Sequence, residues 1–524
     1  MKRLRVVSYA INGRGMGHLV RQLAILRWLR RVAALLEVEC ECWVITSSEA
    51  DTLARREGIP ALKLPSKAML RDAGLAPARY LAITRTWVLN AVAGLQPDVL
   101  LVDTFPGGSF GELVAALELA PHRVLVARRV REAFATQDPY RALLSLYEKV
   151  VVPDDRGTGP ILIRDRSELL DRDDARRALG IPAGRRAVYV SLGGGGDLAA
   201  PGTLPRLVDR LAERGWHAVV GAGPLYEGPE RRGPGVTWLD RYVPLELLTG
   251  VDAAVSACGY NTFHELMYAG VPTVFLPQER IADDQEERAR VAVHAGAGRL
   301  ARSVEEAVDL LDDPGDPEAA KRLVPRNGAR QAALDVLSLV LPAADLEMAA
   351  ALLTPELLGT LRRWTAPGRA GREAPRRALA LTRMLGSGTA ALATLCEVHE
   401  VPFDTAFSLV KGLRRKFPAA DGNDLREAAE TLFPTWARFD DWMGAVSLMR
   451  AVPTQRTLAV SRFATLMARW LANEDDLFDA LRDFSQLEGS GERTIDEVLH
   501  LLTRDRDGLV LQADPAARSA GDSR

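Results

Sequence analysis

The chain has 524 residues, enough for three domains of ordinary size, and its formal net charge of −2 argues against nucleic acid as a partner. Hydrophobic residues make up 47% and charged residues 26%, a composition that excludes a disordered chain. The N-terminus lacks the pattern of a signal peptide, and no run approaches 18 apolar residues. We therefore expect a cytoplasmic protein that is at most peripheral at the inner face of a membrane.

The four cysteines do not have the spacing of a zinc site or of a disulfide framework. Cys40 and Cys42 lie two residues apart in an alternating stretch, which places them on one face of a strand. Neither has a second pair or a histidine nearby. We interpret both as small apolar residues that face a core in a reducing compartment.

Short apolar runs alternate with amphipathic helical patterns over the first 150 residues. Helices are predicted at Arg21–Leu36 and near Gly111–Leu119. The predicted strands are Leu4–Ile11, Glu39–Thr46, Val99–Val102 and Arg123–Val126. This alternation predicts a parallel sheet with helices on both faces.

A second series of the same kind begins near residue 186. Its predicted strands are Ala187–Ser191, His217–Val220, Ala253–Ser256 and Thr273–Leu276, with helices at Leu204–Arg214 and Thr262–Ala269. The charged, Gly- and Pro-rich stretch Asp154–Pro182 is the natural linker. Beyond Leu341 the patterns are helical only. The predicted fold class is α/β, with two tandem Rossmann-like domains at 1–155 and 156–340, an all-α domain at 347–510 and a disordered tail at 513–524.

The first glycine-rich turn, Asn12–His18, follows the first strand and opens a helix. Gly13, Gly15 and Gly17 permit close backbone approach, and the helix N-terminus offers free amides to an anion or a sugar. The spacing differs from the dinucleotide fingerprint, and no Gly-Lys-Ser/Thr of a P-loop follows. His18 stands where the strand delivers its loop into the crevice, so a catalytic and a structural role are equally open.

Two further turns occupy the corresponding places in the second series. Gly193, Gly194, Gly195 and Gly196 follow a strand, and four consecutive glycines favour close contact with a ligand such as a diphosphate over a plain turn. Gly259 permits the third turn, with Asn261 or Thr262 as the expected N-cap of the next helix. Glu265 follows in that helix, where a carboxylate can accept hydrogen bonds from a ribose diol.

At these residues the chain resembles the family 28, MurG-like glycosyltransferases. The motif is Ser-x-x-Gly-Tyr-Asn-Thr-x-x-Glu from Ser256, then Gly-x-Pro, then Pro-x₆-Asp-Gln ending at Gln285. The resemblance covers roughly residues 1–335. It implies a GT-B fold, with an acceptor in the first domain, near the loop of Gly13, Gly15 and Gly17, and a nucleotide-sugar donor in the second.

The same resemblance implies a role for each motif residue. The donor diphosphate would lie against Gly193–Gly196 and against Gly259, Tyr260, Asn261 and Thr262. Glu265 would hold the ribose, Asp284 and Gln285 the donor sugar, and Leu239–Val243 the base.

Departures from the family pattern narrow the interpretation. Arg14 and Met16 interrupt the glycine loop, and the Pro-rich acceptor loop of the MurG group is absent, which argues against MurG itself. The segment Gly15–Arg21 is equally similar to the loop of nucleotide-sugar hydrolases on the same scaffold, in which the equivalent histidine activates water.

We therefore predict an inverting glycosyltransferase that uses a nucleoside-diphosphate sugar, with UDP implied by the family. His18 is the first candidate base and Asp103 the second. Asp103 is equally open as a carboxylate that caps the loop Thr104–Gly108. No Asp-x-Asp follows an apolar strand at the crevice, so no metal or other cofactor is expected.

Three rival functions use the same donor site: a nucleotide-sugar hydrolase, a 2-epimerase, and a non-catalytic sensor of nucleotide sugars. The basic stretch Lys63–Arg85 is suited to an anionic lipid-linked or phosphorylated acceptor and to peripheral contact with a membrane, but a mobile surface loop with ordinary helix charges is the favoured interpretation. The helical domain could recognise an acceptor, self-associate or bind a protein partner.

Overall fold

The computed structural model describes residues 3–11, 15–36, 38–66, 69–70, 73–128, 138–153, 157–193, 200–223, 226–239, 244–278, 284–353 and 403–436, with scattered positions in 380–396 and 460–468. The chain divides into two compact units, Met1–Glu347 and Met348–Arg524. Several predictions lie outside the described residues: those on Gly13, on Gly194, Gly195 and Gly196, on the end of the base segment at 240–243, and on the tail at 513–524.

The first sheet of unit 1 is parallel and has the strand order β3-β2-β1-β4-β5-β6. Its strands are β1 Arg3–Ala10, β2 Glu39–Thr46, β3 Ala61–Lys63, β4 Val99–Asp103, β5 His122–Val126 and β6 Lys149–Val151. The connecting helices are α1 Gly17–Leu35, α2 Thr52–Arg56, α4 Pro77–Leu95, the 3₁₀ helix η1 Val114–Leu119 and α6 Asp138–Leu144. All sheet pairs join in parallel, as the alternation of strands and helices predicts.

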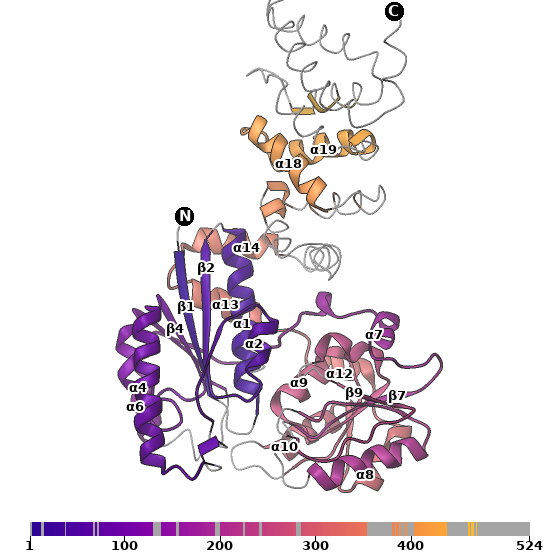
Figure 1. Ribbon diagram of the computed structural model, residues 1–524. Helices are drawn as coiled ribbons and strands as arrows, with labels where there is room; N and C mark the ends of the chain where they lie inside the picture. Colours follow the sequence, from indigo (N-terminus) through magenta and orange to yellow (C-terminus); the bar gives the residue numbers. More distant parts are fainter. Residues whose placement is uncertain are drawn as a thin grey trace, which may run out of the picture. The chain divides into compact units, whose positions relative to one another are not determined.

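Alternate residues of β1 face opposite layers of this domain. Val7 and Tyr9 pack in a core with Val88 and Val92 of α4. Ser8 points the other way, and its hydroxyl donates to Gln22 Oε1 of α1 at 2.8 Å. Figure 1 shows α4 and α6 on one side of the sheet and α1 on the other. The side that carries α1 also carries the polar residues of the site.

The second sheet repeats this plan with the strand order β12-β11-β10-β7-β8-β9. Its strands are β7 Ala187–Ser191, β8 His217–Val220, β9 Val236–Trp238, β10 Ala253–Ser256, β11 Thr273–Phe275 and β12 Gly298–Leu300. Its helices are α7 Arg172–Ala178, α8 Ala200–Glu213, α9 Tyr260–Ala269, α10 Gln285–His294, α11 Val304–Asp309 and α12 Pro317–Leu323, with 3₁₀ helices η2 Arg166–Glu168, η3 Leu245–Gly250 and η4 Leu310–Asp312. The prediction of two tandem Rossmann-like domains is confirmed.

Strand order reverses between β1 and β4 in the first sheet and between β7 and β10 in the second. Open parallel sheets bind ligands at such reversal points, beyond the carboxyl ends of the strands. The glycine turn before α1 follows β1, Gly193 follows β7, and Gly259 follows β10. The topology therefore places the predicted ligand turns at the two reversal points.

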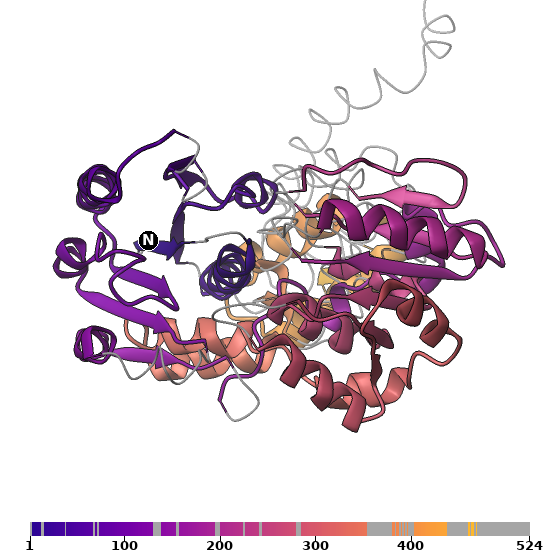
Figure 2. The same cartoon turned by 90° about the horizontal axis from the view of Figure 1, so that it is seen from below.

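The end of unit 1 returns to the first domain. Helix α13 (Ala329–Leu337) packs along α1, and α14 (Ala343–Leu352) follows it. In Figure 2, α1 is seen end-on between the first sheet and the second domain. Helix α1 is thus a shared element, which contacts its own sheet, α13 and the second domain.

The described part of unit 2 is helical, in agreement with the predicted all-α domain. Helices α18 (Phe403–Lys416) and α19 (Gly422–Trp436) share an apolar core that includes Leu409, Leu425 and Phe463. Cys396 is buried in the same core.

Helix α4 refines the sequence interpretation. The stretch Lys63–Arg85 was expected to be a mobile surface loop with ordinary helix charges, and its last residues lie in a helix that begins at Pro77 and runs to Leu95. Proline at the first helical position is favourable because its missing amide proton has no partner there in any case. Tyr80, Thr84, Val88 and Val92 form the buried stripe that holds α4 to the sheet.

Candidate active site

A histidine and a carboxylate meet at the reversal point of the first sheet. His18 lies in the first turn of α1, and Asp103 ends β4. His18 Nδ1 is 2.5 Å from Asp103 Oδ1. The His18 side chain keeps 18% of its surface exposed, whereas that of Asp103 is fully buried. Only His18 of this pair can therefore meet a substrate, and Asp103 is placed to orient it.

Helix α1 supplies two further polar side chains to Asp103, which sequence reasoning missed. Arg21 and Gln22 follow His18 by three and four residues, and this spacing puts all three on one face of the helix. Arg21 donates to both carboxylate oxygens, at 3.1 Å from Nε and 2.6 Å from Nη2. Gln22 Nε2 donates at 3.3 Å and the Thr104 hydroxyl at 2.7 Å. The helical spacing His-x-x-Arg-Gln was the signal in the sequence.

These contacts fix the protonation states of the pair. Burial raises the pKa of Asp103, but Arg21 and His18 outweigh it and hold that pKa far below its usual value. Burial lowers the pKa of His18, and this effect exceeds the opposing influence of Asp103. At neutral pH the imidazole is therefore neutral, with its Nδ1 proton donated to the carboxylate. The Nε2 lone pair is then the basic position.

The N-terminus of α9 in the second domain meets the N-terminus of α1. Asn261 Nδ2 donates to the Gly17 carbonyl at 3.3 Å, and Arg21 Nη1 donates to Asn261 Oδ1 at 3.4 Å. A Cβ on Gly17 would stand 3.5 Å from the Asn261 side chain, so the two turns are in contact. Arg21 thus bridges Asp103 of the first domain and the predicted diphosphate turn of the second.

The expected N-cap of α9 was wrong by two or three residues. Gly259 is the N-cap, without a side-chain cap, and Tyr260 begins the helix, so Asn261 and Thr262 lie inside the first turn. The side chain of Asn261 is therefore available to the contact with α1. The free amides of the first turn remain suited to an anion.

Strained backbone marks the strand ends at both reversal points. Thr104 after β4 has φ 62° and Cys258 after β10 has φ 64°, a left-handed conformation that residues with a Cβ seldom adopt. Such strain costs of order 1–3 kcal/mol and is typical of functional sites. Both residues stand next to the polar cluster described above.

Glu265 lies one turn further along α9, where it is 6% exposed. Its carboxyl makes no hydrogen bond to another residue in the part of the chain that the structure describes. Burial, with a smaller contribution from Glu246 of η3, raises the pKa of Glu265 to about 7. A buried carboxylate of this kind is suited to receive hydroxyl donors from a ligand, as the predicted ribose contact requires.

Replacing Glu265 with glutamine should stabilise the ligand-free protein in a pH-dependent way. The folded pKa exceeds the unfolded value, so ionisation of Glu265 costs stability as pH rises from about 4.5 to about 7. We expect E265Q to gain up to roughly 3 kcal/mol over the wild type above pH 7 and little below pH 4.5. Urea denaturation at several pH values measures this gain. The exposed Glu118→Gln is the control, and a gain independent of pH would contradict the assignment.

The other predicted donor-site residues, Asp284, Gln285 and Gly193, differ in their exposure and in their contacts. Asp284 is exposed and caps α10, where its carboxylate accepts from the Glu287 amide at 3.1 Å. Gln285 is 6% exposed, and its Oε1 accepts from the Gln278 amide at 2.9 Å. Gly193 has φ 96°, and a Cβ there would meet open space. Asp284 and Gln285 are thus held by backbone contacts next to the turn after β11.

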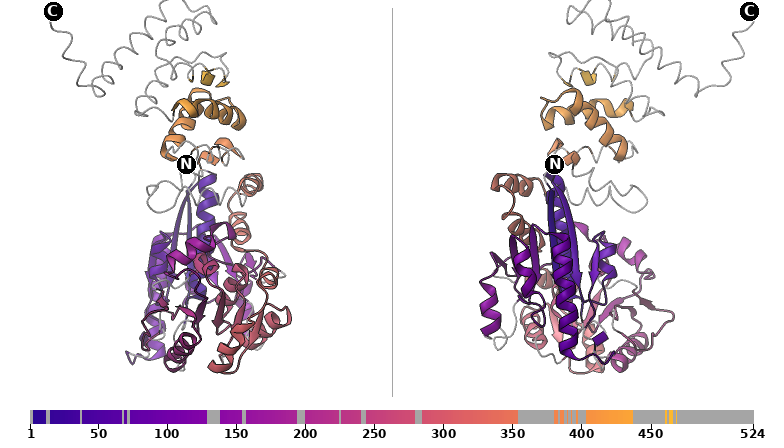
Figure 3. Two further views of the ribbon diagram at one scale, coloured as in Figure 1. Left: turned by 90° about the vertical axis from the view of Figure 1, so that its right-hand side faces the viewer. Right: turned by 60° about the vertical axis from the view of Figure 1, so that its left-hand side comes forward.

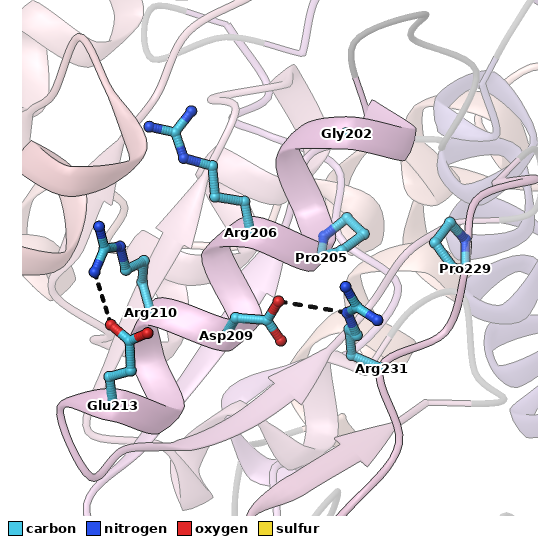
Figure 4. A pocket seen from close by; sticks show the side chains of 8 residues that line it. All are labelled: Gly202, Pro205, Arg206, Asp209, Arg210, Glu213, Pro229 and Arg231. Carbon is cyan, nitrogen blue, oxygen red and sulfur yellow. Dashed lines mark hydrogen bonds and ion pairs between the residues drawn. The ribbon is translucent and has the colours of Figure 1, made fainter.

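A separate hollow of about 370 Å³ lies along α8 and residues 229–231. Figure 4 shows its charged lining, in which Arg231 pairs with Asp209 and Arg210 with Glu213. None of its eight lining residues is among the predicted site residues. Its charges are already neutralised in pairs, so it is not the candidate site.

Metal ligands and membrane spans can be sought among the residues that the structure describes. No group of three or more His, Cys, Asp or Glu side chains there is arranged to hold a metal ion. Among the same residues, no helix combines the length and apolar character needed to cross a bilayer.

The fold and the site define a protein with two Rossmann-like domains, the GT-B arrangement, and a polar cluster where the turns before α1 and α9 meet. No protein-family model matches the chain. It is 29% identical over 178 residues to the UDP-N-acetylglucosamine–N-acetylmuramyl-(pentapeptide) pyrophosphoryl-undecaprenol N-acetylglucosamine transferase of Clavibacter sepedonicus. This match covers 31% of this chain and 48% of the relative. It is 28% identical over 186 residues to an uncharacterized glycosyltransferase of Methanopyrus kandleri, 31% of this chain and 52% of the relative.

The chain thus matches about half the length of these relatives. Among solved structures, the chain is similar to the glycosyltransferase SsfS6 of Streptomyces sp. SF2575 in complex with thymidine diphosphate. The TM-score is 0.45 and the sequence identity 18%, and the match covers 63% of this chain and 99% of that one. The resemblance to MurG-like glycosyltransferases is confirmed by the sequence matches.

Proposed function

We propose that the chain is a metal-independent, inverting glycosyltransferase that takes a sugar from a nucleoside-diphosphate sugar, with UDP as the nucleotide. The observation that carries the proposal is the His18–Asp103 pair, joined through Arg21 and Asn261 to the first turn of α9. A candidate base thus lies next to the first turn of α9, whose free amides are suited to an anion. The sequence similarity to N-acetylglucosamine transferases supports the donor class.

In the proposed reaction, His18 Nε2 takes the proton of the acceptor hydroxyl while Nδ1 keeps its proton on Asp103. The acceptor oxygen forms a bond to the anomeric carbon of the sugar. The bond from that carbon to the diphosphate breaks on the opposite face, and the diphosphate leaves with the electron pair. The amides at the start of α9 and nearby arginines stabilise the charge that develops on the leaving group, which makes a metal unnecessary.

The test measures nucleoside diphosphate released from a panel of nucleotide sugars, with and without a heat-treated cell-envelope extract as a source of acceptors. Release that requires the extract, with the sugar recovered on an acceptor, supports transfer. Rapid release without extract would instead make the protein a hydrolase, in which His18 activates water. Binding without any release would favour an epimerase or a sensor.

We also propose that the first domain contacts a membrane surface through α4 and its neighbours. Apolar side chains exposed there include Met69, Leu75, Trp87, Phe110 and Val114, each at least 40% exposed. Phe110 packs edge-on against Tyr80 of α4, with ring centroids 5.7 Å apart. Helix α4 lies at the left of Figure 1, and this part of the protein comes forward in the right-hand view of Figure 3. The same helix carries Arg79 and Arg85, which are exposed and positively charged.

Replacing Trp87 with glutamate should therefore weaken binding to vesicles that contain anionic phospholipid. The substitution removes an aromatic side chain suited to the interface and adds a charge that the lipid repels. Co-sedimentation with phosphatidylglycerol vesicles measures the effect, and we expect a loss of at least about tenfold in partition. Val291→Glu on α10, exposed by 46%, is the matched control. Equal binding of W87E and wild type would refute the proposed surface.

A further inference from the structure

Glu168, in the linker between the two Rossmann-like domains, binds two arginines of α1. Its Oε1 accepts from Arg27 Nη2 at 2.6 Å and from Arg31 Nη2 at 2.5 Å. Arg27 and Arg31 are four residues apart, which places them on one face of α1. The Glu168 side chain is only 10% exposed. Two charge-assisted contacts, shielded from water, thus join the first domain to the linker.

The carboxylate of Glu168 is also fixed within its own helix, η2. Its Oε2 accepts from the Asp165 amide at 2.9 Å, as part of a capping box. Asp165 in turn accepts from Trp28 Nε1 of α1 at 3.1 Å, through Oδ2. Burial raises the pKa of Glu168, but Arg27 and Arg31 outweigh it and hold that pKa far below its usual value. Glu168 is therefore ionised at neutral pH, with both oxygens in use.

The same short helix is tied to the second domain by Arg166. The amide of Arg166 donates to the Tyr268 hydroxyl at 2.9 Å, and its guanidinium carbon lies 4.7 Å from the centroid of the Tyr268 ring. Arg166 Nη2 also donates to the Val324 carbonyl at 3.1 Å. Tyr268 lies near the end of α9, the helix whose first turn carries Asn261. Through η2, the middle of α1 is thus joined to the last turn of α9.

Helix α1 acts as a lever between η2 and the candidate base. Arg27 follows His18 by nine residues, which is about 13 Å along the helix axis. A tilt of α1 by about 5° at Arg27 would therefore move His18 by roughly 1 Å. A misplacement of about 1 Å can cost about 10²-fold in rate. The contacts of η2 are thus far from the site in distance but able to affect its geometry.

We infer that Glu168 is a positioning residue, which sets the place of His18 relative to the first turn of α9 by fixing α1 to η2. This inference rests on the proposed function, since it concerns the alignment of the proposed base with the proposed diphosphate site. Glu168 acts through α1 and belongs to neither of the glycine turns. Its replacement should therefore affect the rate of transfer and not the affinity for the nucleotide.

The first test is the kinetics of Glu168→Gln, which keeps the size of the side chain and removes its charge. We expect kcat to fall at least about tenfold, while the dissociation constant of UDP stays within about twofold of the wild type. The pH at which the rate falls on acidification should not move, because the partners of His18 are unchanged. Arg31→Gln removes one of the two contacts and should show a smaller loss of the same kind. Circular dichroism shows that each variant is folded.

The second test measures the distance between the two domains and needs no substrate. Spin labels are attached at Glu118→Cys on η1 and Glu213→Cys on α8, two exposed positions of the first and second domains. Cys40 is replaced with serine, because the other three cysteines are buried. Pulsed electron resonance should give a broader distribution of distances in E168Q than in the protein with Glu168.

Glu305→Gln is the matched control. Glu305 also faces two arginines, Arg206 at 2.5 Å and Arg210 at 3.9 Å, but α8 and α11 belong to one domain. This variant should keep the wild-type kcat and the wild-type distances.

A change in only one of the two readouts of E168Q, or in neither, would overturn the inference. So would a loss of UDP affinity as large as the loss of kcat, because Glu168 would then act on the donor site. If E168Q does not fold, R31Q decides by the same criteria. If the wild type turns over no nucleotide sugar, the proposed function fails, and the distance distributions still decide whether Glu168 fixes the two domains.

Discussion

Replacing His18 with alanine is expected to lower the release of nucleoside diphosphate by about 10²- to 10⁴-fold, the usual contribution of a general base. His18 is the exposed member of its pair with Asp103, and its Nε2 is the basic position. Affinity for the nucleotide should change little, because the predicted donor residues lie in the second domain. The loss should therefore appear in kcat. Steady-state rates with the released nucleotide as readout measure it.

The pH profile provides a second check on His18. A base must be unprotonated, so kcat/KM of the wild type should be level at neutral pH and fall on acidification. Burial holds the pKa of His18 below 6.5, so this fall should begin below that pH. His122→Ala is the control, since His122 is partly exposed at the start of β5 and pairs with Glu148. A rate in H18A within threefold of wild type would exclude His18 as the base.

Replacing Arg21 with methionine is expected to cost about 3–5 kcal/mol of the free energy of unfolding. Arg21 is 1% exposed, and its loss leaves the buried Asp103 carboxylate without its cation. That loss is a large fraction of the total stability of an ordinary domain. It also removes the link from Asp103 to Asn261, so catalysis should fall together with stability. Urea denaturation followed by circular dichroism measures the stability.

Arg30→Met is the matched control for Arg21. Arg30 lies on the same helix, is exposed, and donates to the carbonyls of Glu57 and Gly58 at 3.2 and 3.0 Å. Its replacement should cost less than about 1 kcal/mol. Arg21→Lys should recover only part of the loss, because an ammonium group cannot reproduce the paired contacts with Asp103. If R21M unfolded with the same free energy as R30M, the buried ion pair would have no stabilising role.

The fold was largely predictable from the sequence, since local patterns specify its elements. The strands Glu39–Thr46, Ala187–Ser191, His217–Val220 and Ala253–Ser256 have the predicted bounds. The near-continuous apolar runs of the last three are typical of strands buried on both faces. The short strands β3, β6, β9 and β12 were missed, because three residues give no readable period.

The glycine turns and His18 were also visible in the sequence, because a turn that approaches a ligand needs residues without a Cβ and their positions follow apolar strands. Asp103 was visible too, as the second candidate base, but its pairing with His18 was not. Asp103 is 85 residues away from His18 along the chain, and the contact from Arg21 to Asn261 spans 240 residues. The spacing His-x-x-Arg-Gln places Arg21 on the helix face of His18, but it does not show that Asp103 and Asn261 lie beside that face.

The sequence by itself thus determined the two Rossmann-like sheets, the glycine turns and the candidate base, since each depends on the pattern of neighbouring residues. Only the tertiary structure decided that Asp103 is buried behind His18 and that Arg21 bridges the two domains. These features depend on which strand ends come together at the reversal points of two sheets. Burial and charge at such a junction are properties of packing between distant segments, and a local pattern does not encode them.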